Sequence, residues 1–315
     1  MYARFLASTL AIVCAAVAAT GCGSSSAAPE KPDITVSVLP SVDSAGFFIA
    51  LQRGLFAAQG LHVSYVPASS NSAQVVSQQI AGRYDITGES YVTYIEAAAH
   101  THAALDIFAE GSVMQPGSVA LYTMPRSAVH SVASLPGHLI GVDAMFSTDY
   151  LLDVATLVDE GLSTADIQFV PVSLNDMGTA LASHLIDVAT LPEPYASSVQ
   201  EATGAVEVAD LDQGSTQGFP VEGYAVTRSW AARYPATLAA FTRAIEQGQE
   251  IADTDQAAIQ QAMVTYGSFN PVTTAVMTRE TYPLGVDISR LQRVEDLMLQ
   301  FDLLGRPFQI RSIVG

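Results

Sequence analysis

The sequence predicts an α/β fold of two lobes, each a mostly parallel sheet flanked by helices. Short segments of alternating β-branched and small residues, typical of strands, alternate along the chain with segments of helical apolar spacing. The strand–helix order of residues 34–85 is repeated at nearly the same length in residues 139–187. Alternating strands and helices form mostly parallel sheets with helices on their faces, so two such stretches predict two similar lobes.

The first copy begins with a predicted strand, ITVSVLP, and a turn-rich loop, SVDSAG. A helix is expected in FFIALQRGLFAAQG, which ends at Gly60, and a strand in LHVSYVPA. AQVVSQQIAGRYDITG then predicts a helix, a glycine break and a third strand.

The second copy repeats this order. HLIGVDA predicts a strand, MFSTDY a loop, LLDVATLVDEGL a helix closed by Gly161, and IQFVPVS a strand; MGTALASHLIDVATLP adds a helix and a strand. The strand-like segments VALYT (119–123) and GYAVT (223–227) bracket this copy and suit a paired hinge. The C-terminal part is rich in helical patterns and is expected to pack on the first lobe.

Composition excludes several classes of partner. The chain has 315 residues, 49% of them hydrophobic, which suits a globular protein with substantial cores. Its formal charge of −18 argues against nucleic acid and against adhesion to anionic lipid, because both need clustered Lys and Arg. Lys31 is the only lysine.

The N-terminus predicts export. Residues 1–22 combine a basic residue with an apolar run of signal-peptide length and end in Ala-Thr-Gly-Cys, which resembles the lipobox of bacterial lipoproteins. Cys22 is then the lipidation site, and the mature chain has no thiol for a disulfide, a thiolate metal site or a nucleophile. The alternative is an ordinary secretory signal with an incidental cysteine. Residues 23–33 lack apolar periodicity and predict a flexible tether.

The ligand site is predicted at four loops, residues 40–47, 88–91, 144–150 and 191–195. Each follows a predicted strand, and the carboxyl ends of parallel strands gather on one edge of a sheet. The glutamate-and-tyrosine phrases GESY and PEPY supply one such loop in each copy. The predicted ligand-binding residues are Asp43, Ser44, Gly46, Phe47, Glu89, Ser90, Tyr91, Phe146, Ser147, Thr148, Asp149, Glu193 and Tyr195.

Each type of predicted residue has a chemical reason to bind a ligand, and some have an alternative structural role. The Asp, Ser and Thr residues of the first and third loops precede helices, whose free amide groups bind anions; helix capping is the alternative. The aromatic residues could stack on a planar ring or belong to the core. Glu89 and Glu193 are acceptors in a cleft, and the prolines beside Glu193 restrict its backbone.

Several motifs resemble the solute-binding proteins of ABC importers, in the subfamily for nitrate, sulfonates and taurine, and thiamine pyrimidine precursors. They are FFIALQRGLF with the following GL, IAGRYDITG, SLPGHLIGV, LPEPYAS and the segment VTRSWAARYPATLAAFTRAIEQG. Leu191 stands where the family often has an aromatic residue. The resemblance implies a type II periplasmic-binding-protein fold whose hinge is two crossovers. It places lobe 1 at residues 34–122 plus 224–315 and lobe 2 at residues 123–223.

The resemblance also implies a function. The expected protein is a monomeric, lipid-anchored receptor on the extracytoplasmic face of the cell membrane, which delivers a small molecule to an ABC permease and its ATPase, without cofactor or metal. The four loops contain no Arg or Lys but four carboxylates, at Asp43, Glu89, Asp149 and Glu193. This charge favours a thiamine-precursor-like pyrimidine or another neutral-to-cationic compound. A sulfonate, taurine or nitrate held by helix amides is the alternative.

Functions of other classes have weaker support. A fungal pyrimidine-forming relative of this fold uses pyridoxal phosphate, which needs a lysine, and Lys31 lies in the expected tether. No G-x-S-x-G nucleophile elbow is present, so the chain is not expected to be an enzyme. His100 and His102 alternate near a helix end, but zinc needs three or four converging ligands. A receptor that docks on a sensor instead of a permease is compatible with the same sequence.

Overall fold

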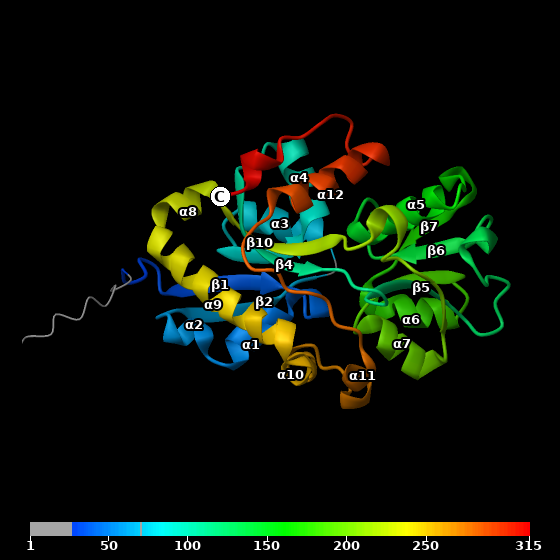
Figure 1. The fold of residues 1–315 in the computed structure, drawn as a ribbon, viewed down its shortest axis with the longest axis horizontal. Helices are drawn as coiled ribbons and strands as arrows, with labels where there is room; N and C mark the ends of the chain where they lie inside the picture. The colour runs from blue at the N-terminus through cyan, green and yellow to red at the C-terminus, as the bar shows by residue number, and fades with distance from the viewer. Residues whose placement is uncertain (1–26, 70) are drawn as a thin grey trace, which may run out of the picture.

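The computed structural model describes residues 27–69 and 71–315. Two lobes lie beside each other, each around a five-stranded sheet (Figure 1). The predicted signal peptide and its Cys22 lie outside the described residues. Within the described ranges, no helix has both the length and the apolarity needed to cross a bilayer.

The first sheet joins strands from both ends of the chain. β1 (Asp33–Val38), β2 (His62–Pro67) and β3 (Ile86–Ser90) are parallel, with β1 in the middle. β10 (Pro220–Thr227) lies antiparallel between β3 and β4 (Leu105–Val113), which gives the order β2-β1-β3-β10-β4.

The second sheet repeats this arrangement. β6 (Leu139–Val142), β7 (Gln168–Pro171) and β8 (Val188–Pro192) are parallel, with β6 in the middle. β5 (Val119–Thr123) lies antiparallel between β8 and β9 (Val206–Asp210), which gives the order β7-β6-β8-β5-β9.

The predicted two-lobed α/β fold with mostly parallel sheets is confirmed: in each sheet one strand, β10 or β5, runs antiparallel and the other strands share one direction. The chain passes between the sheets at residues 114–118 and 211–219, and the strand after each crossing runs antiparallel to its neighbours. The two segments expected to form a paired hinge do not pair with each other, because β5 belongs to the second sheet and β10 to the first. Their strand pattern reflects burial inside separate sheets, so we place the lobe boundaries in the two crossing segments.

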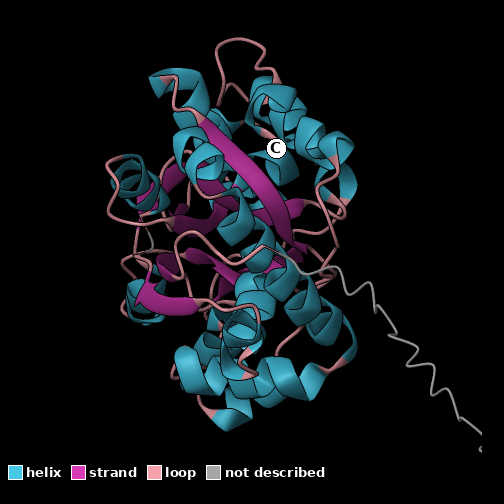
Figure 2. Cartoon of the chain, turned by 90° about the vertical axis from the view of Figure 1, so that its left-hand side faces the viewer, coloured by secondary structure: helices cyan, strands magenta, loops and turns pink. Residues whose placement is uncertain are grey.

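Helices cover both faces of the first sheet (Figures 1 and 2). One face carries α1 (Ala45–Gln52), α2 (Leu55–Ala58), α9 (Pro235–Thr254) and α10 (Gln256–Tyr266). The other carries α3 (Ser72–Ile80), α4 (Tyr91–Thr101) and α12 (Ile288–Gln300), and α8 (Arg228–Arg233) leads from β10 to α9.

The second lobe is flanked in the same way. α5 (Thr148–Asp159) lies on one face of its sheet, and α6 (Leu174–Ala182) and α7 (Tyr195–Thr203) lie on the other (Figure 1). α11 (Pro271–Val276), which follows α10, contacts α7 and so bridges the lobes. Short 3₁₀ helices lie at Val42–Ser44, Val132–Ser134, Thr164–Asp166, Gly214–Thr216 and Ile310–Ile313.

α1 and α9 approach each other closely through a pair of glycines. A Cβ atom on Gly248 would lie 2.1 Å from the carbonyl oxygen of Gly46, and a Cβ on Gly46 would lie 2.6 Å from Gln249 Cγ. Beside this contact, Phe47 is fully buried among aromatic rings that include Phe56, at 5.5 Å between centroids. Gly46 and Phe47 therefore build the core of the first lobe.

Part of the expected tether is bound to the first lobe. Glu30 accepts hydrogen bonds from the amides of Ala236, at 3.0 Å, and Thr237, at 2.9 Å, at the start of α9. Lys31 forms an ion pair with Asp85, which also accepts from the Trp230 indole at 2.7 Å. Glu30 and Lys31, which the sequence assigned to the tether, are therefore held by partners distant in sequence, and β1 already begins at Asp33.

Candidate functional site

A cavity of about 70 Å³ lies where the two sheets face each other. Both lobes supply its polar lining, from loops and strand ends at the carboxyl edges of the parallel strands. The polar lining residues are Asp43, Ser72, Glu89, Ser90 and Glu222 of the first lobe and Asp143, Ser147, Thr148 and Asp149 of the second. The apolar ones are Leu39, Val119, Leu152, Leu174, Pro192 and Val221.

Asp43 and Glu89 enter the cavity from the loop after β1 and from the end of β3. Asp43 Oδ2 accepts from the Ser41 hydroxyl at 2.8 Å, and Oδ1 has no hydrogen-bond partner among the described residues. Burial raises the pKa of Asp43. Burial likewise raises the pKa of Glu89 to about 8; the Ser72 hydroxyl opposes the rise and the Asp143 carboxyl adds to it.

Two further carboxyl groups of the first lobe stand beside Asp43. Glu222, on β10, accepts a hydrogen bond from the Ser44 hydroxyl at 2.5 Å. Burial raises its pKa well above the usual range, and the carboxyls of Asp43 and Glu89 raise it further. Glu280 is 1% exposed, and burial, followed by the Asp43 carboxyl, raises its pKa in the same way.

The second lobe presents three carboxyl groups. Asp143 follows β6 and accepts from the amide of Ala144 at 2.8 Å and from the Ser147 hydroxyl; burial raises its pKa to about 6 against both contacts. Asp149 lies in the first turn of α5, where burial and then the carboxyls of Asp143, Asp153 and Asp43 raise its pKa. Asp153 lies one turn further on and accepts from Thr190 Oγ1 at 2.7 Å.

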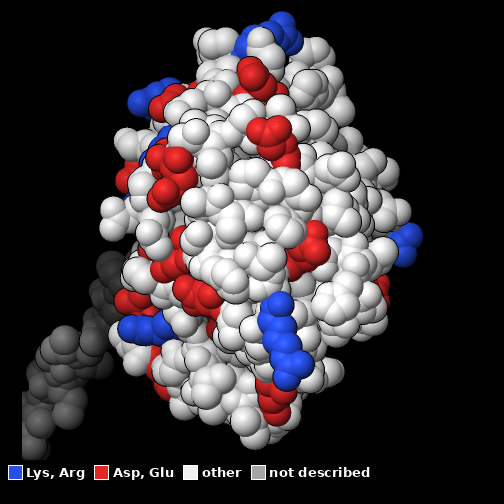
Figure 3. Space-filling model, turned by 90° about the vertical axis from the view of Figure 1, so that its right-hand side faces the viewer, with Lys and Arg blue, Asp and Glu red and all other residues white. Residues whose placement is uncertain are grey.

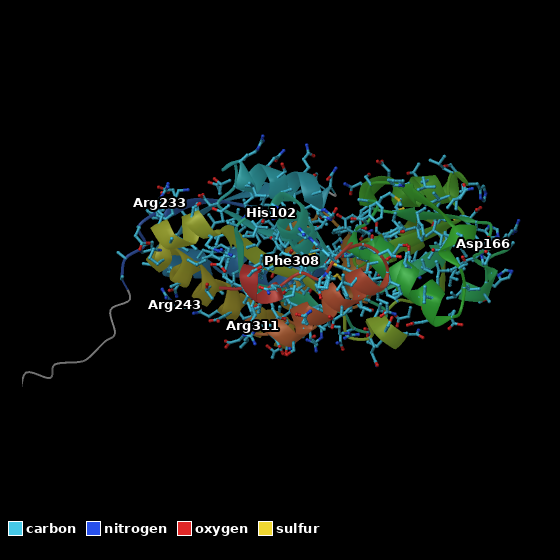
Figure 4. The ribbon with its side chains drawn as sticks, turned by 90° about the horizontal axis from the view of Figure 1, so that it is seen from above. His102, Asp166, Arg233, Arg243, Phe308 and Arg311 are labelled. Atoms are coloured by element: carbon cyan, nitrogen blue, oxygen red, sulfur yellow. The ribbon has the colours of Figure 1, made fainter. Side chains whose placement is uncertain are left out.

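We name these seven residues the interlobe carboxyl cluster: Asp43, Glu89, Glu222, Glu280, Asp143, Asp149 and Asp153. In the described part of the chain, no Lys, Arg or His lines the cavity. Arg290 is committed to Glu110, with both nitrogen–oxygen distances at 2.9 Å, and Arg233 and Arg243 lie at the end of the first lobe away from Asp166 of the second (Figure 4). Buried carboxyls without a cation are either protonated or suited to a positively charged guest.

Six of the thirteen predicted ligand-binding residues line the cavity: Asp43, Glu89, Ser90, Ser147, Thr148 and Asp149. Two of these residues, Ser90 and Ser147, also cap helices. Ser90 Oγ accepts from the Thr93 amide at 3.2 Å at the start of α4, and Ser147 Oγ accepts from the Tyr150 amide at 3.3 Å at the start of α5.

The other seven predicted residues lie elsewhere. Gly46 and Phe47 belong to the packing of the first lobe, Tyr91 is fully buried in its core, and Ser44 touches the cavity only through Glu222. In the second lobe, Phe146 is 49% exposed and lies against Tyr150, with ring centroids 5.3 Å apart, whereas Tyr195 packs on Phe269. The seventh residue, Glu193, has a different role.

Glu193 caps its own helix. Its carboxylate accepts from the Ser197 amide at 3.1 Å and from the Ser197 hydroxyl at 2.7 Å, and the Thr278 amide of the first lobe approaches it at 3.4 Å. Burial raises the pKa of Glu193, and these three hydrogen bonds oppose the rise. The carboxylate is therefore satisfied without a ligand, unlike that of Glu89.

Sequence reasoning missed four carboxyl residues of the cluster. Asp143 is the penultimate residue of the strand segment HLIGVDA and lies one residue before the loop 144–150 that was predicted to belong to the site. Asp153 stands one helical turn after Asp149, a spacing that places both on the same face of α5. Glu222 and Glu280 carried no local signal, because they reach the site from the returning strand β10 and from the segment after α11.

Comparison with known proteins identifies the family. The family model described as NMT1/THI5 like matches residues 41–258. The chain belongs to this family. A curated relative, the riboflavin-binding protein RibY of Chloroflexus aurantiacus, is 25% identical over 246 residues, which cover 76% of this chain and 67% of that protein.

Solved structures share the fold at low sequence identity. The alkanesulfonate-binding protein SsuA of Xanthomonas axonopodis pv. citri, bound to MOPS, is 18% identical with a TM-score of 0.76, over 90% of this chain and 98% of that one. The desulfurization enzyme DSZB is 15% identical with a TM-score of 0.68, over 90% and 96%. The two-lobed architecture therefore occurs in binding proteins and in an enzyme, and the chemistry must be read from the site.

Proposed function

We propose that this protein is the solute-binding component of an ABC importer and captures a small molecule between its lobes. The observation that carries the proposal is the cavity whose polar lining comes from both lobes, at the carboxyl edges of their parallel strands. Family membership and the RibY relative support it. The lobes close around the solute, and the closed form docks on a permease with its ATPase.

The solute of this proposal is a thiamine-precursor-like pyrimidine or another neutral-to-cationic compound. Carboxyl groups dominate the polar lining, and they oppose a sulfonate, taurine or nitrate by desolvation and repulsion. Riboflavin, the solute in the name of the relative, has less support, because no aromatic residue lines the cavity in the described part of the chain. The volume of about 70 Å³ also favours a compact solute, since pockets for drug-sized ligands measure about 300 Å³ or more.

A catalytic role has no support from the lining. Lys31 is the only lysine of the chain, and it is paired with Asp85, which lies outside the cavity lining. Schiff-base chemistry therefore lacks its nucleophile at this site. Within the described residues, no group of three or more His, Cys, Asp or Glu is arranged to hold a metal ion, and His100 and His102 are exposed on and after α4.

The experiment that tests the proposal is identification of the solute that accompanies the protein. Native mass spectrometry of the purified protein is expected to show a bound compound, which denaturation releases. Titration calorimetry with a thiamine pyrimidine precursor, taurine and riboflavin then ranks the classes. Turnover of any of these compounds, or their failure to bind together with no co-purifying solute, would contradict the proposal.

Anchoring is part of the same proposal. Cys22 carries the lipid, and the mature protein is a monomer on the extracytoplasmic face of the cell membrane. Replacing Cys22 with serine is expected to release the protein from the membrane fraction, and metabolic labelling with a fatty acid is expected to mark only the unchanged protein. Retention of the serine variant in the membrane fraction would argue for another anchor.

A further inference from the structure

We infer that the solute is a compact organic cation whose N–H groups bridge carboxylates of both lobes, and that its capture releases protons from the interlobe carboxyl cluster. This inference rests on the proposed function and narrows its solute class. Ammonium, amidinium and guanidinium compounds are the chemical types that meet it, and linear diamines are the simplest probes.

The charge of the cavity lining favours a cation. The cavity gathers carboxyl groups of both lobes, and in the described part of the chain no basic side chain lines it. The fold does not require this, since the alkanesulfonate-binding protein SsuA shares it and was solved with MOPS bound. A buried carboxylate needs a cation or several donors in order to ionise, and the cavity wall supplies only a few hydroxyl and amide donors.

The unpaired oxygen atoms of the cavity lining favour a solute with N–H donors. Three oxygen atoms of the lining have no partner among the described residues: Asp43 Oδ1, Glu89 Oε1 and Thr148 Oγ1. Their residues are 9%, 4% and 8% exposed, so bulk water does not satisfy them. Two of these atoms belong to the first lobe and one to the second. A solute with N–H donors at both ends would satisfy both sides of the cavity together.

Carboxyl groups of the two lobes lie close to each other across the cavity. The Asp43 carboxyl is near enough to Asp149 to raise its pKa, and Asp143 is near enough to Glu89 to do the same. Each pair joins a carboxyl of the first lobe to one of the second. Like charges across a closing interface repel, and a cation between them replaces the repulsion with two attractions.

An organic cation fits better than a metal ion. No group of three or more potential ligand residues in the described ranges has a metal-binding arrangement. Leu39, Val119 and Leu152 supply apolar surface to the same cavity, which suits methylene groups between charged ends. Strongly hydrated metal ions gain nothing from such surface.

The proton released on binding comes from the Glu89 carboxyl. At pH 7 its carboxyl is mostly protonated, because its pKa is about 8; Asp143, Glu222 and the Tyr94 phenol are the titratable groups near it. When a cation binds, the O–H bond of the carboxyl breaks and the proton passes to the buffer. The carboxylate then accepts an N–H bond from the solute. Affinity is therefore expected to rise with pH between about 6 and 8, by up to about tenfold per pH unit for each proton released.

The test is titration calorimetry of the purified protein with 1,4-diaminobutane and agmatine, with 1,4-butanediol and taurine as neutral and anionic comparisons. Repeating each titration in buffers of different ionisation enthalpy counts the protons released. The cations are expected to bind and to release about one proton at pH 7. Glu89→Gln is expected to weaken cation binding by about tenfold or more at pH 8 and to remove most of the proton release.

Glu160→Gln serves as the matched control, because it makes the same substitution at an exposed site at the end of α5; it is expected to leave affinity unchanged. A circular dichroism melt of each variant confirms folding. Taurine binding without cation binding, or cation binding without proton release, would overturn the inference. Cation heats that are absent at millimolar concentration would also overturn it, while a co-purifying solute would still uphold the proposed function.

Discussion

Replacing Glu89 with glutamine is expected to stabilise the folded protein near neutral pH. Glu89 is 4% exposed, and burial raises its pKa from 4.5 to about 8. At pH 7 ionisation of this carboxyl lowers the free energy of the unfolded chain, whereas in the folded chain the carboxyl stays mostly protonated. The interval between pH 7 and the unfolded pKa of 4.5, converted at about 1.4 kcal/mol per pH unit, corresponds to a loss of about 3 kcal/mol in the free energy of unfolding.

The pH dependence has a definite sign. A carboxyl whose pKa is raised by folding contributes stability that is complete below its unfolded pKa and is lost as pH rises through the folded value. The free energy of unfolding of the variant should therefore exceed that of the unchanged protein by about 3 kcal/mol at pH 7 and by almost nothing at pH 4.5.

Chemical denaturation of dialysed protein at both pH values measures this effect. Equal slopes for the two proteins would show that the denaturant midpoints report stability alone. The exposed-site variant Glu160→Gln should change the free energy of unfolding by less than about 0.5 kcal/mol. A Glu89→Gln variant that is less stable than the unchanged protein at pH 7, or equally stable, would refute the assignment of Glu89 as a buried, unsatisfied carboxyl.

Two further variants test the framework of the site. Glu201 on α7 accepts hydrogen bonds from Asn270 Nδ2, at 2.9 Å, and from the Thr273 hydroxyl, across the lobes, so Glu201→Ala should weaken solute binding about fivefold in titration calorimetry. An unchanged dissociation constant would show that these contacts do not hold the closed form. Gly248→Ala forces a methyl group against the Gly46 carbonyl and should lower the free energy of unfolding by about 1–3 kcal/mol; an unchanged melting temperature would contradict the close helix contact.

The two lobes could be predicted because each is a local repeat. The strand and helix patterns of residues 34–85 and 139–187 each fall within one lobe, so the local periodicity was enough to predict the strand–helix order of both lobes. The sheet order could not be read in the same way. β5 and β10 each follow a crossing between the lobes and pair with strands distant in sequence, and nothing within VALYT or GYAVT specifies which lobe receives the strand.

The segments GESY and PEPY show how the residue after a glutamate decides whether that glutamate faces the cavity or caps a helix. In the first, Ser90 caps α4, so Glu89 is free to face the cavity. In the second, Pro194 stands at the capping position with no hydroxyl to offer, and Glu193 satisfies the amide of Ser197 instead. Similar sequence therefore produced one cavity carboxyl and one helix cap, because the residue after each glutamate differs.

Repulsion within the cavity also gives a physical reason for solute-dependent closure. Asp43 and Glu89 of the first lobe face Asp149 and Asp143 of the second, so closing the lobes brings carboxyl groups together and strips them of water. Closure without a cation requires protonation, whereas closure on a cation allows ionised carboxylates to pair. A ligand shifts a conformational equilibrium only by its difference in affinity for the two states. For the organic cation proposed above, the cluster would supply that difference, because carboxyl groups of both lobes surround the cation only after closure.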